Sequence, residues 1–175
     1  ATMDAVAQRA GMSKKTIYRE FKSQFDLLAA LLAESAATLG ALPAPRPGAD
    51  IEAQLHDVLM HVVGHLTTPR ALALARLLIS ELRRYPELIN HVAEKHYPEE
   101  VLAQWLAAPA VSSRYDVGDP MEGAAMLLGM VMQDAVLNLI LPGAAPVDAA
   151  TFDARARRAA GLFLRGVRRD PVAAG

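Results

Sequence analysis

The chain has 175 residues, of which 53% are hydrophobic and 21% charged, and its formal net charge is −1 at pH 7. This balance suits one medium domain, or a small domain joined to a larger one, and argues against a disordered chain. The absence of cysteine excludes disulfides and thiolate metal sites. With no charged-then-apolar leader and four polar residues interrupting the most apolar run, 121–142, we expect a cytoplasmic protein without a membrane span.

Three helices are expected at the beginning of the chain. Thr2 can cap a first short helix that ends at Gly11, and Ser13 can cap a second one. A longer helix is expected from about residue 23 to residue 42, with its leucines facing inward. Strand signals are nearly absent, so the predicted fold class is all-α.

The proline-rich segment 43–48 (PAPRPG) breaks the helical pattern, since proline fixes φ and removes a hydrogen-bond donor. We therefore expect an N-terminal domain of residues 1–42 and a larger helical domain of residues 43–175. The helices expected in the larger domain cover residues 50–66, 69–85, 86–108 with a break near Pro98, 121–141 and 149–167, and residues 109–120 are expected to form a loop.

Two short helices joined by a glycine turn are typical of a helix-turn-helix, whose second helix enters the DNA major groove. The charged residues between positions 9 and 22 are Arg9, Lys14, Lys15, Arg19, Glu20 and Lys22. Lysines in the first turn of a helix lie at the positive end of its dipole, which is mildly unfavourable unless an anion compensates. DNA phosphates would supply that anion, and a merely solvated lysine pair is the alternative.

The expected contacts follow from the geometry of the motif. Lys14, Lys15 and Thr16 are expected in the groove, and Thr2 and Tyr18 are expected to reach phosphate oxygens. The small core between the two helices is expected to consist of Ala7, Ala10, Met12, Ile17 and Phe21.

In TMDAVAQRAGMSKKTIYREFKSQFDLLAALL, several residue types recur at fixed offsets: Thr2, Val6-Ala7, Ala10-Gly11-Met12-Ser13, Ile17-Tyr18, Phe21 and Leu27-Leu28. This pattern resembles the DNA-binding region of the tetracycline-repressor (TetR) family. The resemblance implies phosphate contacts at Thr2 and Tyr18 and groove contacts at Lys14, Lys15 and Thr16. It covers about 30 residues, and the rest of the chain agrees only in being helical and of suitable length.

The chain departs from the family pattern at two points. The family has another helix before this motif, so the chain is expected to be a truncated or partly ordered version of a longer protein. Gln24 stands where the family usually has a lysine that contacts phosphate. Glu20 lies on the exposed side, where it can accept from a cytosine amine or remain a solvated carboxylate.

The resemblance also implies that the larger domain binds a small molecule and dimerises through its last two helices. The sequence supports dimerisation independently, because residues 121–141 are apolar nearly all round and residues 149–167 carry an apolar stripe. Ordinary core helices of a monomer are the alternative. The residues expected at the dimer face are Met121, Ala125, Leu128, Met132, Phe163 and Val167.

The expected effector pocket is apolar with a few polar groups, which suits a hydrophobic or aromatic effector. Its predicted lining is His56, Leu59, Met60, Val63, Glu81, Tyr85 and Trp105. His61 and His65 are four residues apart, but no further ligand accompanies them, so no metal or other cofactor is expected.

These observations predict a homodimeric, ligand-responsive transcriptional regulator, most simply a repressor that a small apolar or aromatic effector releases from a palindromic operator. Its expected partners are double-stranded operator DNA, the effector and a second copy of the chain. The alternative is a helical small-molecule binding protein with a non-functional DNA-binding head. No nucleophile elbow, phosphate-binding loop or zinc signature is present, so no enzyme is expected.

Overall fold

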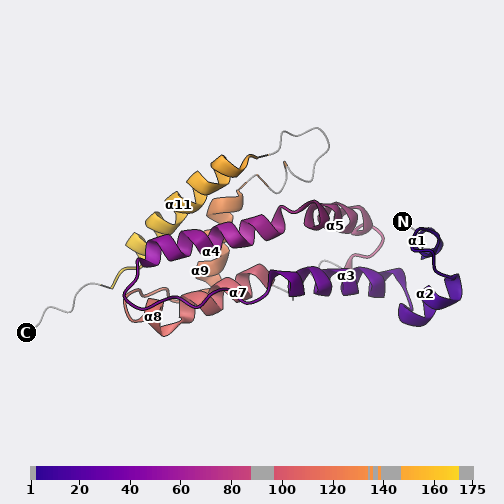
Figure 1. Cartoon of the computed structure of the whole chain (residues 1–175), viewed down its shortest axis with the longest axis horizontal. Helices are drawn as coiled ribbons and strands as arrows, with labels where there is room; N and C mark the ends of the chain where they lie inside the picture. The colour runs from indigo at the N-terminus through magenta and orange to yellow at the C-terminus, as the bar shows by residue number, and fades with distance from the viewer. Residues whose placement is uncertain (1–2, 88–96, 134, 136–137, 139–146, 170–175) are drawn as a thin grey trace, which may run out of the picture. The chain divides into compact units, whose positions relative to one another are not determined.

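The computed structural model describes residues 3–87, 97–133, 135, 138 and 147–169. Every regular element within these residues is a helix (Figure 1). One antiparallel backbone bridge joins Tyr115 to Arg168, beside the end of the last helix. The predicted all-α fold class is confirmed.

The chain divides into two compact units. Unit 1 comprises Ala1–Thr38 and Ala73–Lys95, and unit 2 comprises Leu39–Leu72 and His96–Gly175. Two helices, α3 (Gln24–Leu39) and α5 (Pro69–Glu81), contribute residues to both units. A functional boundary between residues 42 and 43 stays a prediction.

Unit 1 begins with the two short helices α1 (Met3–Arg9) and α2 (Lys14–Glu20), followed by α3. Helix α3 ends at Leu39, three residues before the predicted end. The reason is local, because Gly40 has φ +68°, a left-handed conformation that ends a helix, and prolines follow.

Unit 2 holds the main hydrophobic core. Its helices, apart from the parts of α3 and α5, are α4 (Ile51–Leu66), α7 (Tyr97–Ala107), α8 (Pro109–Ser112), α9 (Pro120–Met132) and α11 (Ala149–Gly166). Helix α9 packs against α7, and α11 packs against both α4 and α9. Leucines from α4, α7 and α9 fill the space between these helices, with Leu55, Leu59, Leu106 and Leu127 fully buried.

Several boundaries differ from the sequence-based expectation. Helix α5 ends at Glu81 rather than Tyr85. Helix α7 begins at Tyr97, next to the break predicted near Pro98, and residues 88–96 before it lie outside the described residues. Pro98 lies in the first turn of α7, which fits proline's missing N–H. Residues 109–112, expected in a loop, form the short helix α8 with Pro109 in its first turn. Helix α9 ends at Met132 because Gln133 has φ +40°, and most of the predicted remainder to residue 141 lies outside the described residues.

Among the described residues, no single helix is long and apolar enough to cross a membrane. Helices α4 and α5, taken together as a bent pair, meet the requirement by length and composition only.

Candidate nucleic-acid interface and ligand cavity

The turn between α1 and α2 has the geometry of a Schellman motif. The Met12 N–H donates to the Ala7 carbonyl at 2.9 Å, and the Gly11 N–H donates to the Gln8 carbonyl at 3.3 Å. Gly11 has φ +65°, which a side chain would strain. The glycine therefore fixes the angle at which the chain leaves α1 and enters α2.

Ser13 caps α2, as predicted from the sequence. Its backbone is extended, and its Oγ accepts a hydrogen bond from the Thr16 N–H at 3.1 Å. The Ser13 Oγ also lies 2.8 Å from the Thr16 Oγ1. At the other end, the Phe21 N–H donates to the Ile17 carbonyl at 2.8 Å, so α2 is capped at both ends.

A small core holds α1 and α2 together. Met3, Ala7 and Ile17 are buried, and the residues packed around them are Val6, Phe21 and Leu27. Ala7, Ile17 and Phe21 were expected there, but Ala10 and Met12 were not correctly predicted. Both are exposed, Met12 at 41%, because they belong to the turn rather than to the inward face of a helix.

Lys14, the first residue of α2, forms an ion pair with Asp4 of α1. Both side chains stay largely exposed, at 67% for Lys14 and 51% for Asp4. The hydrogen bond to Asp4 and the carboxylate's charge raise the pKa of the Lys14 ammonium above its usual value. An internal carboxylate therefore compensates part of the conflict between Lys14 and the helix dipole.

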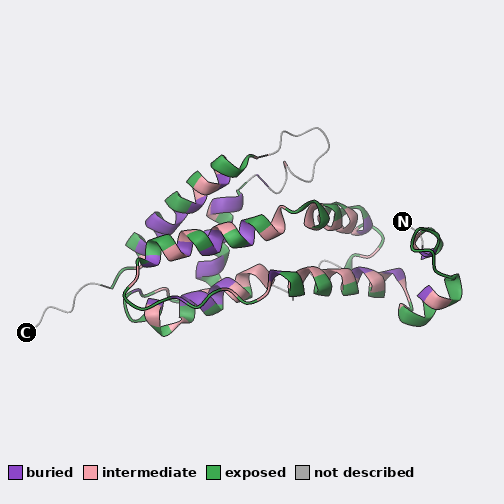
Figure 2. Ribbon diagram, viewed as in Figure 1, coloured by how far each residue is buried: buried purple, intermediate pink, exposed green. Residues whose placement is uncertain are grey.

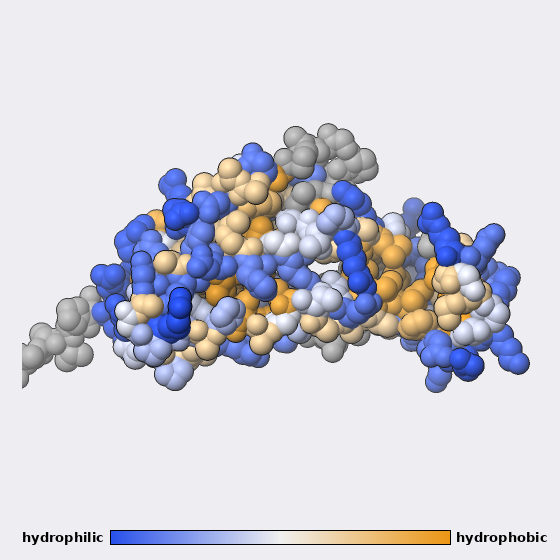
Figure 3. Space-filling view, in the orientation of Figure 1, coloured by the Kyte–Doolittle hydropathy of each residue, from blue (hydrophilic) through white to orange (hydrophobic). Residues whose placement is uncertain are grey.

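The other side chains predicted to meet DNA lie mostly on the solvent side of α2. Lys15 and Tyr18 are exposed, Tyr18 at 50%, whereas Thr16 is half-buried. Glu20 is exposed and pairs with Arg19 at 3.0 Å. Figure 2 shows that most of α2 is exposed, and Figure 3 shows hydrophilic side chains gathered around it.

Two of the residues predicted to contact DNA are not part of this exposed surface of α2. Gln24 is buried, and its Oε1 accepts a hydrogen bond from Arg84 Nη1 at 3.5 Å. The Gln24 side chain thus makes its contact within unit 1, and a DNA contact at Gln24 stays a prediction. Thr2 lies outside the described residues.

The residues predicted to line an effector pocket are divided between the two units. Leu59 and Val63 are buried in the core of unit 2, and Met60 packs against that core. Glu81 and Tyr85 belong to unit 1. For the α4 residues the structure corrects the predicted lining, because Leu59, Met60 and Val63 pack in or against the core of unit 2 rather than facing a cavity.

His56, also predicted at the pocket, instead ties α4 to α11. Its Nε2 lies 2.8 Å from Asp153 Oδ1, and its Nδ1 lies 3.2 Å from Asp57 Oδ1. The pKa of the Asp153 carboxyl is lowered below its usual value, mainly by the hydrogen bond from Arg157 and next by the hydrogen bond from His56. His56 is therefore a structural contact between helices.

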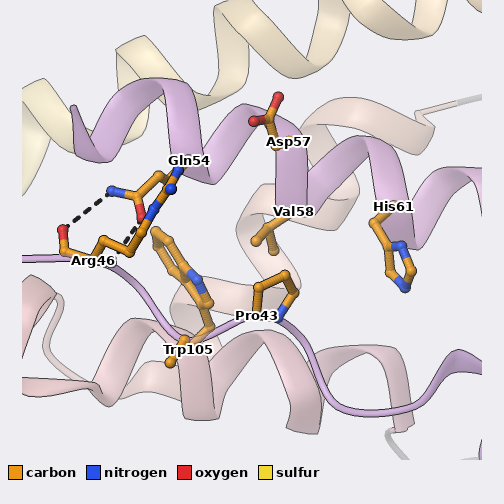
Figure 4. Close-up of a pocket in the computed structure, with 8 residues that line it drawn as sticks. Pro43, Arg46, Gln54, Asp57, Val58, His61 and Trp105 are labelled. Atoms are coloured by element: carbon orange, nitrogen blue, oxygen red, sulfur yellow. Dashed lines mark hydrogen bonds between the residues drawn. The ribbon is translucent and has the colours of Figure 1, made fainter. Parts of the chain in front are cut away.

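A cavity of about 380 Å³ opens elsewhere in unit 2, between α4, α7 and the segment that precedes α4 (Figure 4). Trp105, which was predicted to line a pocket, lies on the floor of this cavity with Val58. The remaining lining residues are Pro43, Ala44, Arg46, Gln54, Asp57 and His61. Sequence reasoning treated residues 43–48 as a linker only, so it missed the wall that this segment supplies.

Both parts of the chain match a known family. Residues 53–166 match the family described as AefR-like transcriptional repressor, C-terminal domain, and residues 1–31 match that described as bacterial regulatory proteins, tetR family. The first match alone covers more than half of the chain. The chain belongs to the TetR family of transcriptional regulators. The resemblance seen in the sequence is confirmed, and the protein is a DNA-binding transcriptional regulator.

Solved structures of TetR-family regulators share the fold. One from Mesorhizobium loti is 21% identical, with a TM-score of 0.76 over 97% of this chain and 87% of that one. One from Pseudomonas syringae pv. tomato is 24% identical, with a TM-score of 0.75 and the same coverage. The Flavonoid-responsive Regulator FrrA is 26% identical, with a TM-score of 0.76 over 98% of this chain and 88% of FrrA. No curated protein matches the sequence.

In this TetR-family regulator, the residues predicted at a dimer face divide into two groups. Leu128, Met132 and Phe163 are buried in the core of unit 2, because α9 packs against both α7 and α11. Their placement corrects the expectation that they face a second subunit. Ala125 is exposed, and the two that are half-buried are Met121 and Val167. Met126 and Leu162, on the same two helices, are also exposed, at 54% and 49%.

Proposed function

We propose that this TetR-family regulator is a homodimeric repressor whose recognition helix α2 reads operator DNA, and that a small aromatic effector releases it. Family membership supports DNA binding, and dimerisation and small-molecule response are typical of the family. The observation that carries the proposal is the exposed first turn of α2, held on a capped turn and a small buried core.

The exposed surface of α2 suits contact with DNA. Lys15 can reach a guanine or a phosphate, and the Tyr18 phenol can donate to a phosphate oxygen one turn further along. Lys14 would reach DNA after exchanging its Asp4 contact for a phosphate or a base. In a dimer, the two recognition helices would read half-sites about 34 Å apart, or a multiple of that distance.

A second copy would cover the exposed apolar residues of α9 and α11. Met126 and Leu162 are large, exposed and carried by two helices that pack against each other. Pairing these helices with their counterparts would bury both side chains in a four-helix interface. An effector would then act by binding one state of this dimer better than the other.

The name of the Flavonoid-responsive Regulator FrrA states that this similar protein responds to flavonoids, which are aromatic. An aromatic effector is accordingly our proposal for this chain. This proposal agrees with the small apolar or aromatic effector expected from the sequence.

The test is binding of the protein to the DNA upstream of its own gene, measured by fluorescence anisotropy at two salt concentrations. The variant Lys14→Ala/Lys15→Ala is compared with Lys22→Ala, which removes an exposed lysine just beyond α2. We expect selective, salt-sensitive binding that the double variant weakens by roughly tenfold or more and Lys22→Ala much less. Equal binding to scrambled DNA, unchanged in the double variant, would instead support a small-molecule binding protein with a non-functional head.

A further inference from the structure

We infer that the cavity between α4, α7 and residues 43–46 is the effector site, and that it takes a flat aromatic acid with a hydroxyl group at its far end. This inference rests on the proposed function and adds a site, a ligand class and a route of action. Figure 4 shows the cavity with Arg46 and Gln54 at one end, His61 at the other, and Trp105, Pro43 and Val58 between them.

The middle of the cavity suits a flat ring system. The Trp105 indole and the Val58 side chain are buried and form its floor, and Pro43 lies beside the indole. Aromatic rings stack favourably on such a surface. The volume of about 380 Å³ falls at the lower end of ligand pockets, so it suits a ligand of two or three rings.

The backbone of Arg46 is anchored at one end of the cavity. Gln54 clamps the Arg46 backbone from both sides: its Oε1 accepts from the Arg46 N–H at 2.8 Å, and its Nε2 donates to the Arg46 carbonyl at 3.4 Å. Prolines on both sides of Arg46 further restrict the segment. No ion pair joins the guanidinium to any residue that the structure describes, so it can bind a ligand carboxylate bidentately.

The Asp57 carboxylate does not lie at the centre of the cavity, where it would repel an anionic ligand bound to Arg46. Its carboxylate points away from Trp105 and Pro43 in Figure 4, and it lies 3.2 Å from His56 Nδ1. The cavity thus presents a cation at one end without an acid across its floor, which favours an anionic ligand over a neutral one.

The His61 end supplies a hydrogen-bond acceptor and a link to α3. His61 Nε2 lies 3.3 Å from the Leu39 carbonyl, and since a carbonyl only accepts, Nε2 carries the proton. In the neutral ring Nδ1 is then free to accept from a ligand hydroxyl. Leu39 is the last residue of α3, which begins in unit 1. A ligand that fixes the His61 ring would therefore fix the end of α3, and so favour one state of the regulator.

The probe is 6-hydroxy-2-naphthoate, which carries a carboxylate and a hydroxyl at opposite ends of two flat rings, and its neutral carboxamide is the matched control. Calorimetry measures affinity, and quenching of Trp105, the sole tryptophan, reports whether the probe lies at the cavity floor. We expect the acid to bind and quench, and the amide to bind roughly tenfold more weakly. No binding of the acid, or binding without quenching, would overturn the inference.

Two arginine variants test whether Arg46 binds the carboxylate of the probe. Arg46→Gln should bind the acid about tenfold more weakly and lose the preference for acid over amide. Arg114→Gln removes an exposed arginine that does not line the cavity and should behave as the wild type. An unchanged preference in Arg46→Gln would contradict the assigned site, even if the regulator binds DNA as proposed.

Two histidine variants test the route to α3. His61→Ala should still bind the acid within a few-fold, but the acid should no longer change its DNA affinity. His65→Ala, one turn along α4 and outside the cavity lining, should keep the response. A normal response in His61→Ala would overturn the route. If the wild type binds no DNA but binds the acid through Arg46, the proposed repressor fails while the ligand site stands.

Discussion

At the scale of single residues, the ion pair between Asp4 and Lys14 answers why a lysine begins the recognition helix. The sequence predicted an external anion, and the structure supplies an internal one ten residues away along the chain. Local spacing on one helix gives no signal for this pair, because it forms only once the Gly11 turn brings α1 and α2 together. Ser13, in contrast, was predictable, since a cap depends on its own neighbours alone.

We predict that Asp4→Asn makes the regulator bind DNA more tightly and less selectively. The substitution frees the Lys14 ammonium for phosphate contact, so the slope of log affinity against log salt should steepen by roughly 0.9. Affinity for scrambled duplex should rise more than affinity for operator. Anisotropy titrations over a salt series measure both.

Asp26→Asn is the control, because it removes the same charge from an exposed residue of α3. If both variants steepen the slope equally, general charge rather than the Lys14 contact is responsible, and the special role of Asp4 is wrong.

At the scale of helices, most elements follow from sequence periodicity and caps, and their ends follow from special backbone geometry. Helix α4 begins where it was expected, and Asp50 caps it by accepting from the Glu52 and Ala53 N–H groups. The early end of α9 at Gln133, with φ +40°, was not predictable, because a glutamine carries no turn signal. The place of His56 was not predictable either. It was expected in the pocket, but it contacts Asp153, which is 97 residues away in the sequence.

Two glycines test how closely the helices of unit 2 approach one another. A Cβ added at Gly123 of α9 would lie 2.8 Å from Val117 Cγ1 and 3.1 Å from Phe163 Cζ. One added at Gly161 of α11 would lie 2.7 Å from Glu52 Oε1, the end of a flexible side chain. We expect Gly123→Ala to lower the free energy of unfolding by about 1 kcal/mol or more, because the valine is stiff and the contact is overpacked.

Gly161→Ala should be neutral or slightly stabilising, because Glu52 can move aside and alanine favours a helix by up to about 1 kcal/mol over glycine. Urea denaturation of both variants, followed by circular dichroism, gives the comparison. If Gly161→Ala proves less stable than Gly123→Ala, the flexibility of the neighbouring side chain does not decide how much an added Cβ destabilises the fold.

At the scale of the whole molecule, the sequence predicted a family and a dimer, but it assigned the dimer face partly to buried residues. We predict that Met126→Asp and Leu162→Asp each shift the regulator from dimer to monomer, since each places a charge in the proposed apolar interface. Sedimentation equilibrium measures the mass, and circular dichroism checks that each variant folds.

Ile79→Asp is the matched control, because Ile79 is a large hydrophobic residue, 50% exposed, on α5. It should leave the mass of a dimer unchanged. A wild-type protein that sediments as a monomer, or aspartate variants that stay dimeric, would contradict the proposed interface.

The division into two units has a consequence for engineering chimeric regulators. Unit 1 is assembled from two stretches of chain, 1–38 and 73–95, and Arg84 from the second stretch donates to the buried Gln24 of the first. A head grafted onto another sensor at residue 42 would therefore leave Gln24 without its donor. A functional transplant must carry both stretches, or must choose a recipient that already has an arginine at the position of Arg84.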